Sequence, residues 1–228
     1  MKNEELEIMQ IIVSQDIQQR CPEFTGAAVL ASVENTETNE GLWQEIDRFI
    51  AEYRSRYTTE SIKQMPSILA TREAYKRCGK DPSRYRPSGE ALVRRTLKGG
   101  DLYHVSTLVD LINLASIRFG YSIGGFDADR IQGNVLTLGI GREGEPYEGI
   151  GRGPLNIEGL PVYRDAEGGI GTPTSDHERT KISLETTRLL CIVNGYDGNS
   201  EDTLACARYL QELLKKYAAS DGGQIILF

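Results

Sequence analysis

The spacing of the apolar residues changes near Gly120, and this change constrains the fold more than any other feature of the chain. Before it, apolar residues recur with helical periodicity over 3–19, 40–57, 68–78 and 102–119. After it, short β-branched runs alternate with glycine-rich turns over 121–131, 134–141, 147–159 and 160–165. Helices and strands that occupy separate parts of a chain indicate the α+β class.

The remaining elements complete this prediction. Ser88 is expected to cap a helix that begins near Glu90, and Gly79 to end the helix before it. Strands are expected at 27–33, 189–193 and 224–228, and a closing amphipathic helix at 200–217. With 228 residues, the chain is expected to form one domain.

Composition narrows the function classes. The chain carries a net charge of −7, its first ten residues are rich in acids, and no apolar run approaches the ~20 residues of a membrane helix. We therefore expect a soluble, cytoplasmic protein that binds neither membranes nor DNA nonspecifically. The four cysteines form no CxxC pair and are expected to be reduced packing residues: Cys21, Cys78, Cys191 and Cys206.

Two common site types are not predicted. The glycines of GIGREG fit a dinucleotide-binding pattern, but Pro146 and the glycines after it do not allow the helix that such a site needs, so this is a turn. His104 and His177 are too few for a histidine-rich metal site and are expected at the surface or as helix caps. We predict no metal and no cofactor.

The segment from Arg72 to Lys98 is strongly basic. It holds nine bases against three acids, a local charge of +6 that leaves −13 for the rest of the chain. One interpretation is a solvated helix face. The other is a strip that contacts phosphates, with Tyr75 and Tyr85 as stacking groups.

The helix expected over 102–119 is apolar nearly all round, yet Asp110, Asn113 and Ser116 lie three residues apart on one face. Buried polar groups need partners. These three either form an internal hydrogen-bond network or line a polar pocket.

A polar loop precedes a buried strand between Gly168 and Asp197. Its hydroxyls at Thr172, Thr174, Ser175 and Thr180 become nucleophiles only beside a base, and His177 is the one candidate, so a covalent hydrolase is a minor alternative. The apolar run LLCIV follows and ends at polar Asn194.

Three motifs carry a family resemblance. These are RPSGEALVRR, the turn FD-x-D-x-I-x-G that begins at Phe126 and Asp127, and SDHERTKISLETTRLLCIVNGYD. Their order and spacing resemble the editing module of the phenylalanyl-tRNA synthetase beta chain and its free-standing B3/B4 relatives. The resemblance covers 66–217, with 1–65 as an amino-terminal helix-strand-helix portion and 218–228 as a closing strand. It implies mixed, largely antiparallel sheets flanked by helices, and a Thr-rich helix after Ile182.

In the synthetase, this module hydrolyses tRNA that is wrongly charged with tyrosine, mainly by positioning the ester and a water. The resemblance implies catalytic roles for Asn113, Thr180 and Ser175. It implies substrate contacts for Ser116, Phe126, Asp127, Gly168, Gly169, Thr174, Arg179 and Asn194. The basic strip then supplies tRNA contacts through Arg84, Arg86, Arg94, Arg95 and Lys98.

Two family positions differ in this chain. Gly124 stands where bacterial synthetases have a histidine, and Ile192 stands near the acid that reads the tyrosine hydroxyl. Loss of that acceptor weakens tyrosine discrimination. Two functions follow as hypotheses: a deacylase of mischarged aminoacyl-tRNA that acts in trans, and a noncatalytic module that binds an amino acid, a nucleotide or a structured RNA.

Overall fold

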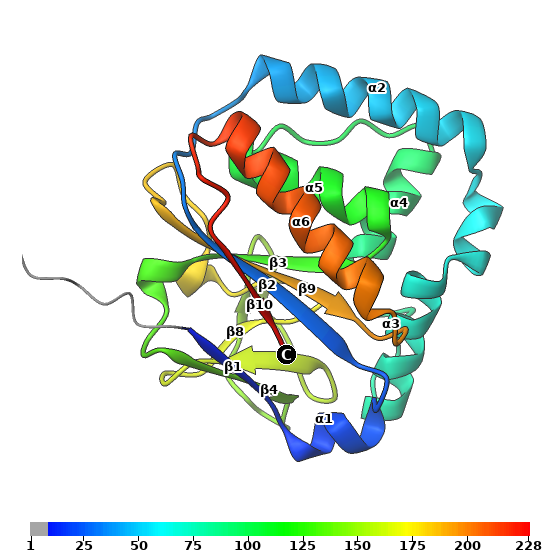
Figure 1. Ribbon diagram of the computed structural model, residues 1–228. Coiled ribbons are helices and arrows are strands. Elements are labelled where there is room, and N and C mark those ends of the chain that lie inside the picture. The colour runs from blue at the N-terminus through cyan, green and yellow to red at the C-terminus, as the bar shows by residue number, and fades with distance from the viewer. Residues whose placement is uncertain (1–8) are drawn as a thin grey trace, which may run out of the picture.

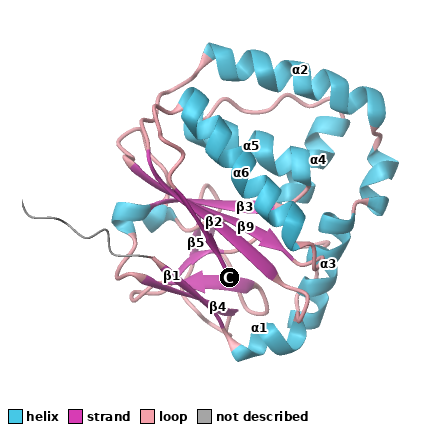
Figure 2. Ribbon diagram, viewed as in Figure 1, coloured by secondary structure: helices cyan, strands magenta, loops and turns pink. Residues whose placement is uncertain are grey.

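The computed structural model describes residues 9–228 and contains three layers, one of helices and two of strands (Figures 1 and 2). The helices are α1 (Gln15–Arg20), α2 (Glu40–Arg56), α3 (Pro66–Cys78), α4 (Ser88–Leu97), α5 (Thr107–Phe119) and α6 (Ser200–Tyr217). Short 3-10 turns are η1 (Thr59–Gln64), η2 (Ala128–Arg130) and η3 (Glu178–Thr180). The strands are β1 (Gln10–Val13), β2 (Thr25–Ser32), β3 (Ser122–Asp127), β4 (Val135–Ile140), β5 (Glu148–Gly149), β6 (Gly153–Pro154), β7 (Pro161–Arg164), β8 (Gly169–Gly171), β9 (Arg188–Gly195) and β10 (Gln224–Leu227).

The central sheet is antiparallel, with the strand order β10-β2-β9-β3. Its strands β2 and β9 are apolar on both faces because each face packs against a different layer. Leu189, Cys191 and Val193 belong to the core on the helical side, whereas Leu190 and Ile192 belong to the core on the other side. A sheet covered on both faces is expected to read as a continuous apolar run, as LLCIV does.

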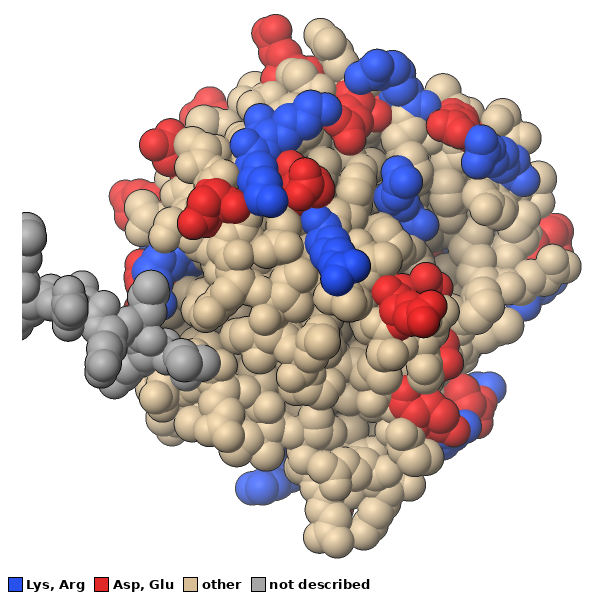
Figure 3. Space-filling view, viewed as in Figure 1, with Lys and Arg blue, Asp and Glu red and all other residues tan. Residues whose placement is uncertain are grey.

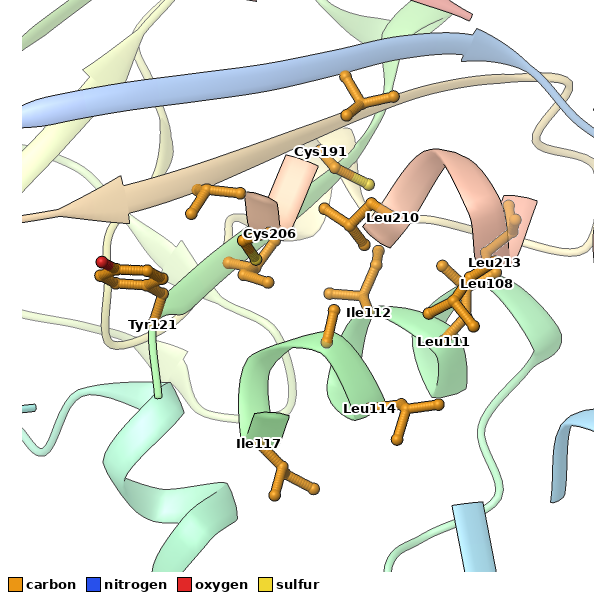
Figure 4. Packing of buried hydrophobic residues seen from close by; sticks show 14 of the residues in the cluster. Leu108, Leu111, Ile112, Leu114, Ile117, Tyr121, Cys191, Cys206, Leu210 and Leu213 are labelled. Carbon is orange, nitrogen blue, oxygen red and sulfur yellow. The ribbon is translucent and has the colours of Figure 1, made fainter. Parts of the chain in front are cut away.

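Helices α5 and α6 cover one face of this sheet, and α2 packs outside α5. Figure 4 shows Leu108, Leu111 and Ile112 of α5 beside Leu210 and Leu213 of α6, close to Cys191 of β9. Helix α5 is therefore buried nearly all round, as its sequence predicts.

The opposite face packs on a second, mixed sheet with the order β1-β4-β7-β8, in which β1 runs parallel to β4 and the other pairs are antiparallel. Leu136, Leu138 and Tyr163 fill the space between the sheets. The predicted α+β class and mixed, largely antiparallel sheets are thus confirmed.

Helix α3 closes one side of the two sheets, and Gly79 ends it in a left-handed conformation (φ +95°) as predicted. The turn GIGREG is followed by no helix, also as predicted. The short hairpin of β5 and β6 contacts the polar loop through a bridge between Gly149 and His177.

Four sequence predictions about elements were wrong. Residues 10–13, expected in a helix over 3–19, form β1, while 3–8 lie outside the described residues. Residues 102–106 are extended, so α5 begins five residues later than predicted. Ser88 is the first residue of α4 and not its cap, and the segment after Ile182 is a turn without a helix.

Charges of both signs are interspersed over the helical part of the face shown in Figure 3, whereas the region over the strands near the carboxyl terminus is largely uncharged. In the described part of the chain, no helix is long and apolar enough to cross a membrane.

Candidate functional site

A cavity of about 510 Å³ lies between α4, α5, the edge strand β3 and the loop that follows β8. One part of its wall is apolar and the other is polar. The apolar lining residues are Leu92, Val105, Val109, Ile112, Ile123, Ile150 and Ile182. The polar lining residues are Ser88, Asn113, Ser116, Thr172, Ser175, Asp176 and Lys181, with the backbone of Gly125 between the two groups.

The extended segment before α5 forms part of the rim, and Asp110 holds it in place. Its Oδ1 accepts a hydrogen bond from the backbone N–H of Val105 (3.1 Å), and its Oδ2 accepts one from Nε1 of Trp43 (2.9 Å). Burial raises the pKa of Asp110. Of the two interpretations of the polar face of α5, the internal network therefore describes Asp110.

Asn113 and Ser116 do line the cavity, one turn apart on α5. Ser116 donates its hydroxyl to the carbonyl of Tyr121 (2.5 Å), which links the end of α5 to the start of β3. The Asn113 side chain makes no hydrogen bond to any residue within 9–228, so both its donor and its acceptor are free for a ligand.

The polar wall is a tight turn over 172–175 that hydrogen bonds within itself. The Thr172 hydroxyl accepts the N–H groups of Thr174 (3.2 Å) and Ser175 (3.1 Å) and donates to the carbonyl of Ser175 (3.0 Å). The carbonyl of Pro173 accepts the N–H of Ser88 (2.7 Å), which fastens the turn to the start of α4. The polar wall is consequently a fixed structure.

Asp176 is the acidic group among the residues that line the cavity, and the sequence interpretation did not name it. Its Oδ2 accepts the backbone N–H of Gly125 (3.0 Å). Its Oδ1 lies where Cβ atoms on Gly124 and Gly171 would be only 3.3 and 3.0 Å away, so the carboxyl occupies a space that exists because these residues lack side chains. Burial raises the pKa of Asp176 to about 7, against the opposing effect of the Gly125 hydrogen bond.

A single cation borders the cavity among its lining residues. The Lys181 ammonium lies 2.6 Å from the Glu178 carboxylate, and the Lys181 side chain is nearly half exposed. An exposed, paired lysine leaves the local charge close to zero. The interior of the cavity is therefore dominated by Asp176 and the Asn113 amide.

Three of the residues predicted for the site come together in this cavity: Asn113, Ser116 and Ser175. Thr180 does not line it. It is fully buried, and its hydroxyl has no hydrogen-bond partner within residues 9–228. Thr174 belongs to the turn, but its side chain does not line the cavity. Its hydroxyl bonds to the Tyr75 hydroxyl (2.8 Å) and the Tyr85 carbonyl (3.2 Å).

Phe126 and Asp127 lie beside the cavity without lining it. The Phe126 ring is buried between the two sheets and covers Gly124 and Gly171. Asp127 caps η2 through the N–H of Asp129 and accepts the hydroxyl of Thr186 (3.0 Å). Both are positioned to support the fold around the cavity.

Four further predicted residues lie elsewhere. Arg179 forms a two-pronged ion pair with Asp165 (2.9 Å for each nitrogen), whose Oδ1 also accepts the N–H of Gly168. Gly169 packs against Tyr147. Asn194 is buried in β9 and bonds to the Tyr163 hydroxyl and the Ser122 carbonyl.

The basic segment divides between internal contacts and exposed groups. Tyr75 is fully buried and cannot stack on a base, whereas Tyr85 is half-buried beneath the Lys80 ammonium. Arg86 and Arg94 pair with the buried carboxylate of Glu90, and Arg95 bonds to the Asp101 carbonyl and lies over the Tyr103 ring. Arg84 and Lys98 are exposed.

Histidine and cysteine contribute no evident chemistry to the cavity. His177 accepts the N–H of Arg179 (2.9 Å) and caps η3, as predicted, while burial and the Arg179 charge lower its pKa. All four cysteines are free and buried. Across residues 9–228, no cluster of three or more histidine, cysteine or acidic side chains is arranged to hold a metal ion.

Comparison with known proteins identifies a family model, described as B3/4 domain, that matches residues 70–218. Among solved structures, the chain is similar to an N-terminal fragment of the phenylalanyl-tRNA synthetase beta-subunit from Pyrococcus horikoshii, with 16% sequence identity and a TM-score of 0.46. That match covers 95% of this chain and 50% of the other, so the chain spans about half the length of that fragment. No curated protein matches the chain.

Proposed function

Because the chain belongs to the B3/4 domain family, we propose that its cavity binds the aminoacyl end of a mischarged tRNA and that the protein hydrolyses the ester in trans. The cavity volume of about 510 Å³ lies within the range of small-molecule sites. Its apolar wall suits an amino-acid side chain, and its polar wall suits the ester and a water.

The observation that carries the proposal is the Asp176 carboxyl, whose pKa is raised to about 7 inside the cavity. A general base is most effective when its pKa lies near the working pH. Ionised Asp176 would accept a proton from a water as the water oxygen attacks the ester carbonyl carbon. The bond from that carbon to the ribose oxygen then breaks, and the ribose oxygen takes up the proton.

Asn113 supports the same chemistry from the opposite wall. Its side-chain amide is unpaired within residues 9–228, so its N–H can donate to the ester carbonyl oxygen, on which negative charge develops. This role needs a donor fixed on a rigid element, and α5 is buried nearly all round.

The lining of the cavity favours an apolar amino acid as substrate. Gly124 and Ile192 are directly paired across β3 and β9, and the Phe126 ring covers Gly124. Ile192 is fully buried in the core between the two sheets, and neither position lines the cavity. Ile112, Ile123 and Ile182 supply apolar surface in the cavity itself.

One observation favours the second function, a noncatalytic binding module. The hydroxyls of Ser116, Thr172 and Ser175 each donate to a backbone carbonyl of the protein, so none of them is held ready as a nucleophile. A site of this kind binds an amino acid or an aminoacyl group through Asn113 and Asp176 without turnover.

Hydrolysis of a panel of mischarged tRNAs separates the two functions. The wild type is expected to release the amino acid from at least one tRNA that carries an apolar residue. Asp176→Asn is expected to slow release about 10²-fold or more, because it removes the base and keeps the shape of the side chain. Asp47→Asn, an identical change on the exposed face of α2, is the matched control and should leave the rate unchanged.

Other outcomes are equally informative. Binding of aminoacyl-tRNA without release by the wild type supports the binding module. Release that is as fast in Asp176→Asn as in the wild type contradicts the assigned role of Asp176 as the base.

A further inference from the structure

A second hollow, of about 330 Å³, lies on the other side of α4, between α3, α4 and η1. Arg72, Arg86 and Arg94 converge on it, from α3, from the loop before α4 and from α4 itself. Ile62, Ile68 and Leu69 supply its apolar floor and edge. The hollow is distinct from the cavity that contains Asp176, since no residue lines both.

The single carboxylate of Glu90 forms ion pairs with three guanidinium groups. Its Oε2 lies 2.8 Å from Arg72, and its Oε1 lies 3.0 Å from Arg94 and 3.6 Å from Arg86. The Glu90 side chain is only 2% exposed, whereas those of the three arginines are 27–45% exposed. The carboxylate therefore forms the base of the cluster, and the arginines form its solvent-facing layer.

The cluster has more positive charge than its carboxylate can neutralise. Three arginines against one glutamate leave a charge of +2, while Lys63 at the rim is paired with Glu60 at 2.8 Å. In addition, the buried Nε of Arg94 has no hydrogen-bond partner in the described part of the chain. Repulsion among guanidinium groups held this close decreases when an anion binds between them.

We propose that this hollow is a phosphate-binding site, in which Arg72, Arg86 and Arg94, held in place by Glu90, bind a phosphate ester. Guanidinium groups suit this ligand because each presents several N–H donors in a plane that matches phosphate oxygens. Glu90 keeps the side chains in position before the ligand arrives, which lowers the ordering cost of binding.

The position of the hollow connects it with the cavity. Along α4, Ser88 and Leu92 line the cavity, whereas Glu90 and Arg94 line the hollow, and residues two apart on a helix point to nearly opposite sides. The two sites are thus separated by about one helix diameter, ~10 Å. A single strand whose aminoacyl end enters the cavity would place a phosphate of a preceding nucleotide in the hollow; this assignment of the ligand rests on the proposed function, whereas the phosphate site itself does not.

The test compares two double variants with the same change in net charge. Arg86→Gln/Arg94→Gln removes two arginines of the hollow and leaves Arg72 to neutralise Glu90. Arg48→Gln/Arg208→Gln removes two exposed arginines, on α2 and α6, that do not line the hollow and belong to neither proposed site. Each is titrated with a short single-stranded RNA that ends in CCA, followed by fluorescence anisotropy, and with inorganic pyrophosphate, followed by calorimetry.

Arg86→Gln/Arg94→Gln is expected to bind the RNA and pyrophosphate more weakly than the wild type, by about tenfold or more. The affinity of the control double variant is expected to change much less. The salt dependence of RNA binding by Arg86→Gln/Arg94→Gln should also be shallower, with a slope reduced by about 0.7 for each lost phosphate contact. Loss for RNA identifies the phosphate of a strand as the ligand, and loss for pyrophosphate alone identifies a small, free phosphate compound. Equal losses in both double variants, or no binding of either probe by the wild type, overturn the site.

Arg86→Lys/Arg94→Lys tests whether weaker binding results from misfolding. This variant keeps the charges and removes the planar donors, so an intermediate affinity is expected, with thermal unfolding close to wild type. Deacylation by Asp176→Asn is measured separately. Hydrolysis without phosphate binding at the hollow leaves the proposed function intact, and phosphate binding without hydrolysis leaves the site intact.

Discussion

Asp176 owes its raised pKa to burial, in a space left by two glycines of which one, Gly124, is remote from it in the sequence. Gly124 lies on β3 and Gly171 ends β8, and their lack of side chains allows the carboxyl to approach the backbone closely, where it accepts the N–H of Gly125. Local pattern therefore could not distinguish Asp176 from the other polar residues of the loop.

The raised pKa predicts that Asp176 destabilises the protein at neutral pH. Because its folded-state pKa of about 7 lies above the ~4 of an unfolded aspartate, the unfolded chain releases the proton first as the pH rises. Stability is thus lost between about pH 4 and pH 7. Asp176→Asn should exceed the wild type in free energy of unfolding, by a margin that grows by about 1–3 kcal/mol between pH 5 and pH 8.

Urea denaturation at the two pH values measures this margin. Asp47→Asn, at an exposed position on α2, should show no such growth. A margin that is the same at both pH values would show that the Asp176 carboxyl is not held in its neutral form by burial. A site residue that lowers the stability of the protein in this way is expected where function and stability compete.

Other residues of the site differ in how far the sequence could place them. Asn113 and Ser116 share a helical face, which predicts that they point the same way, and both line the cavity. Helical spacing also predicts that Tyr75 lies on a helix. Its inward direction, however, depends on the Thr174 hydroxyl, which is 99 residues away. Thr180 resembles a site residue in its local context and is instead fully buried.

At the scale of elements, α4 is the wall shared by the cavity and the arginine hollow, and its first turn touches β3 directly. The N–H of Gly89 donates to the Ser122 hydroxyl (3.1 Å). A Cβ at position 89 would lie 2.7 Å from the Tyr121 carbonyl oxygen and 2.9 Å from the Ser122 nitrogen, both of which are backbone atoms. Gly89 is therefore required for this close approach.

Gly89→Ala is expected to push α4 away from β3. We predict a loss of about 1–3 kcal/mol in the free energy of unfolding, together with weaker phosphate binding and slower deacylation, because both sites share this helix. Gly41→Ala in α2 is the control, since its Cβ would make ordinary contacts of 3.4 Å or more. Retention of both activities in Gly89→Ala would show that the two sites do not depend on this contact.

The elements that the sequence predicted poorly are those whose conformation depends on residues distant in the chain. The apolar residues of 10–13 fit a helix, but they form β1 because β4 offers a parallel edge with register partners over its first four residues. Residues 102–106 stay extended because Asp110, which Trp43 holds from 67 residues away, accepts the N–H of Val105. Helices α2, α3 and α6, whose patterns and caps are local, agree closely with prediction.

At the scale of the whole molecule, the family match over 70–218 leaves out part of the central sheet. Strand β2 lies between β9 and β10 and pairs with β9 over all of Thr25–Ser32. Its residues enter both cores: Ala27, Val29 and Ala31 on the helical side, Ala28 and Leu30 on the other. The amino-terminal portion thus supplies an interior strand and is not an appendage.

This arrangement predicts that the fragment 66–217 does not fold by itself. Without β2, strand β9 would expose its backbone donors and acceptors along one edge and apolar side chains on both faces. The fragment should lack a cooperative thermal transition and near-ultraviolet circular dichroism, whereas a chain of 9–228, which keeps β2 and β10, should show both. Cooperative unfolding of 66–217 would mean that the family region is a domain in its own right and that β2 is an added strand, because only then could β9 remain ordered without its neighbour.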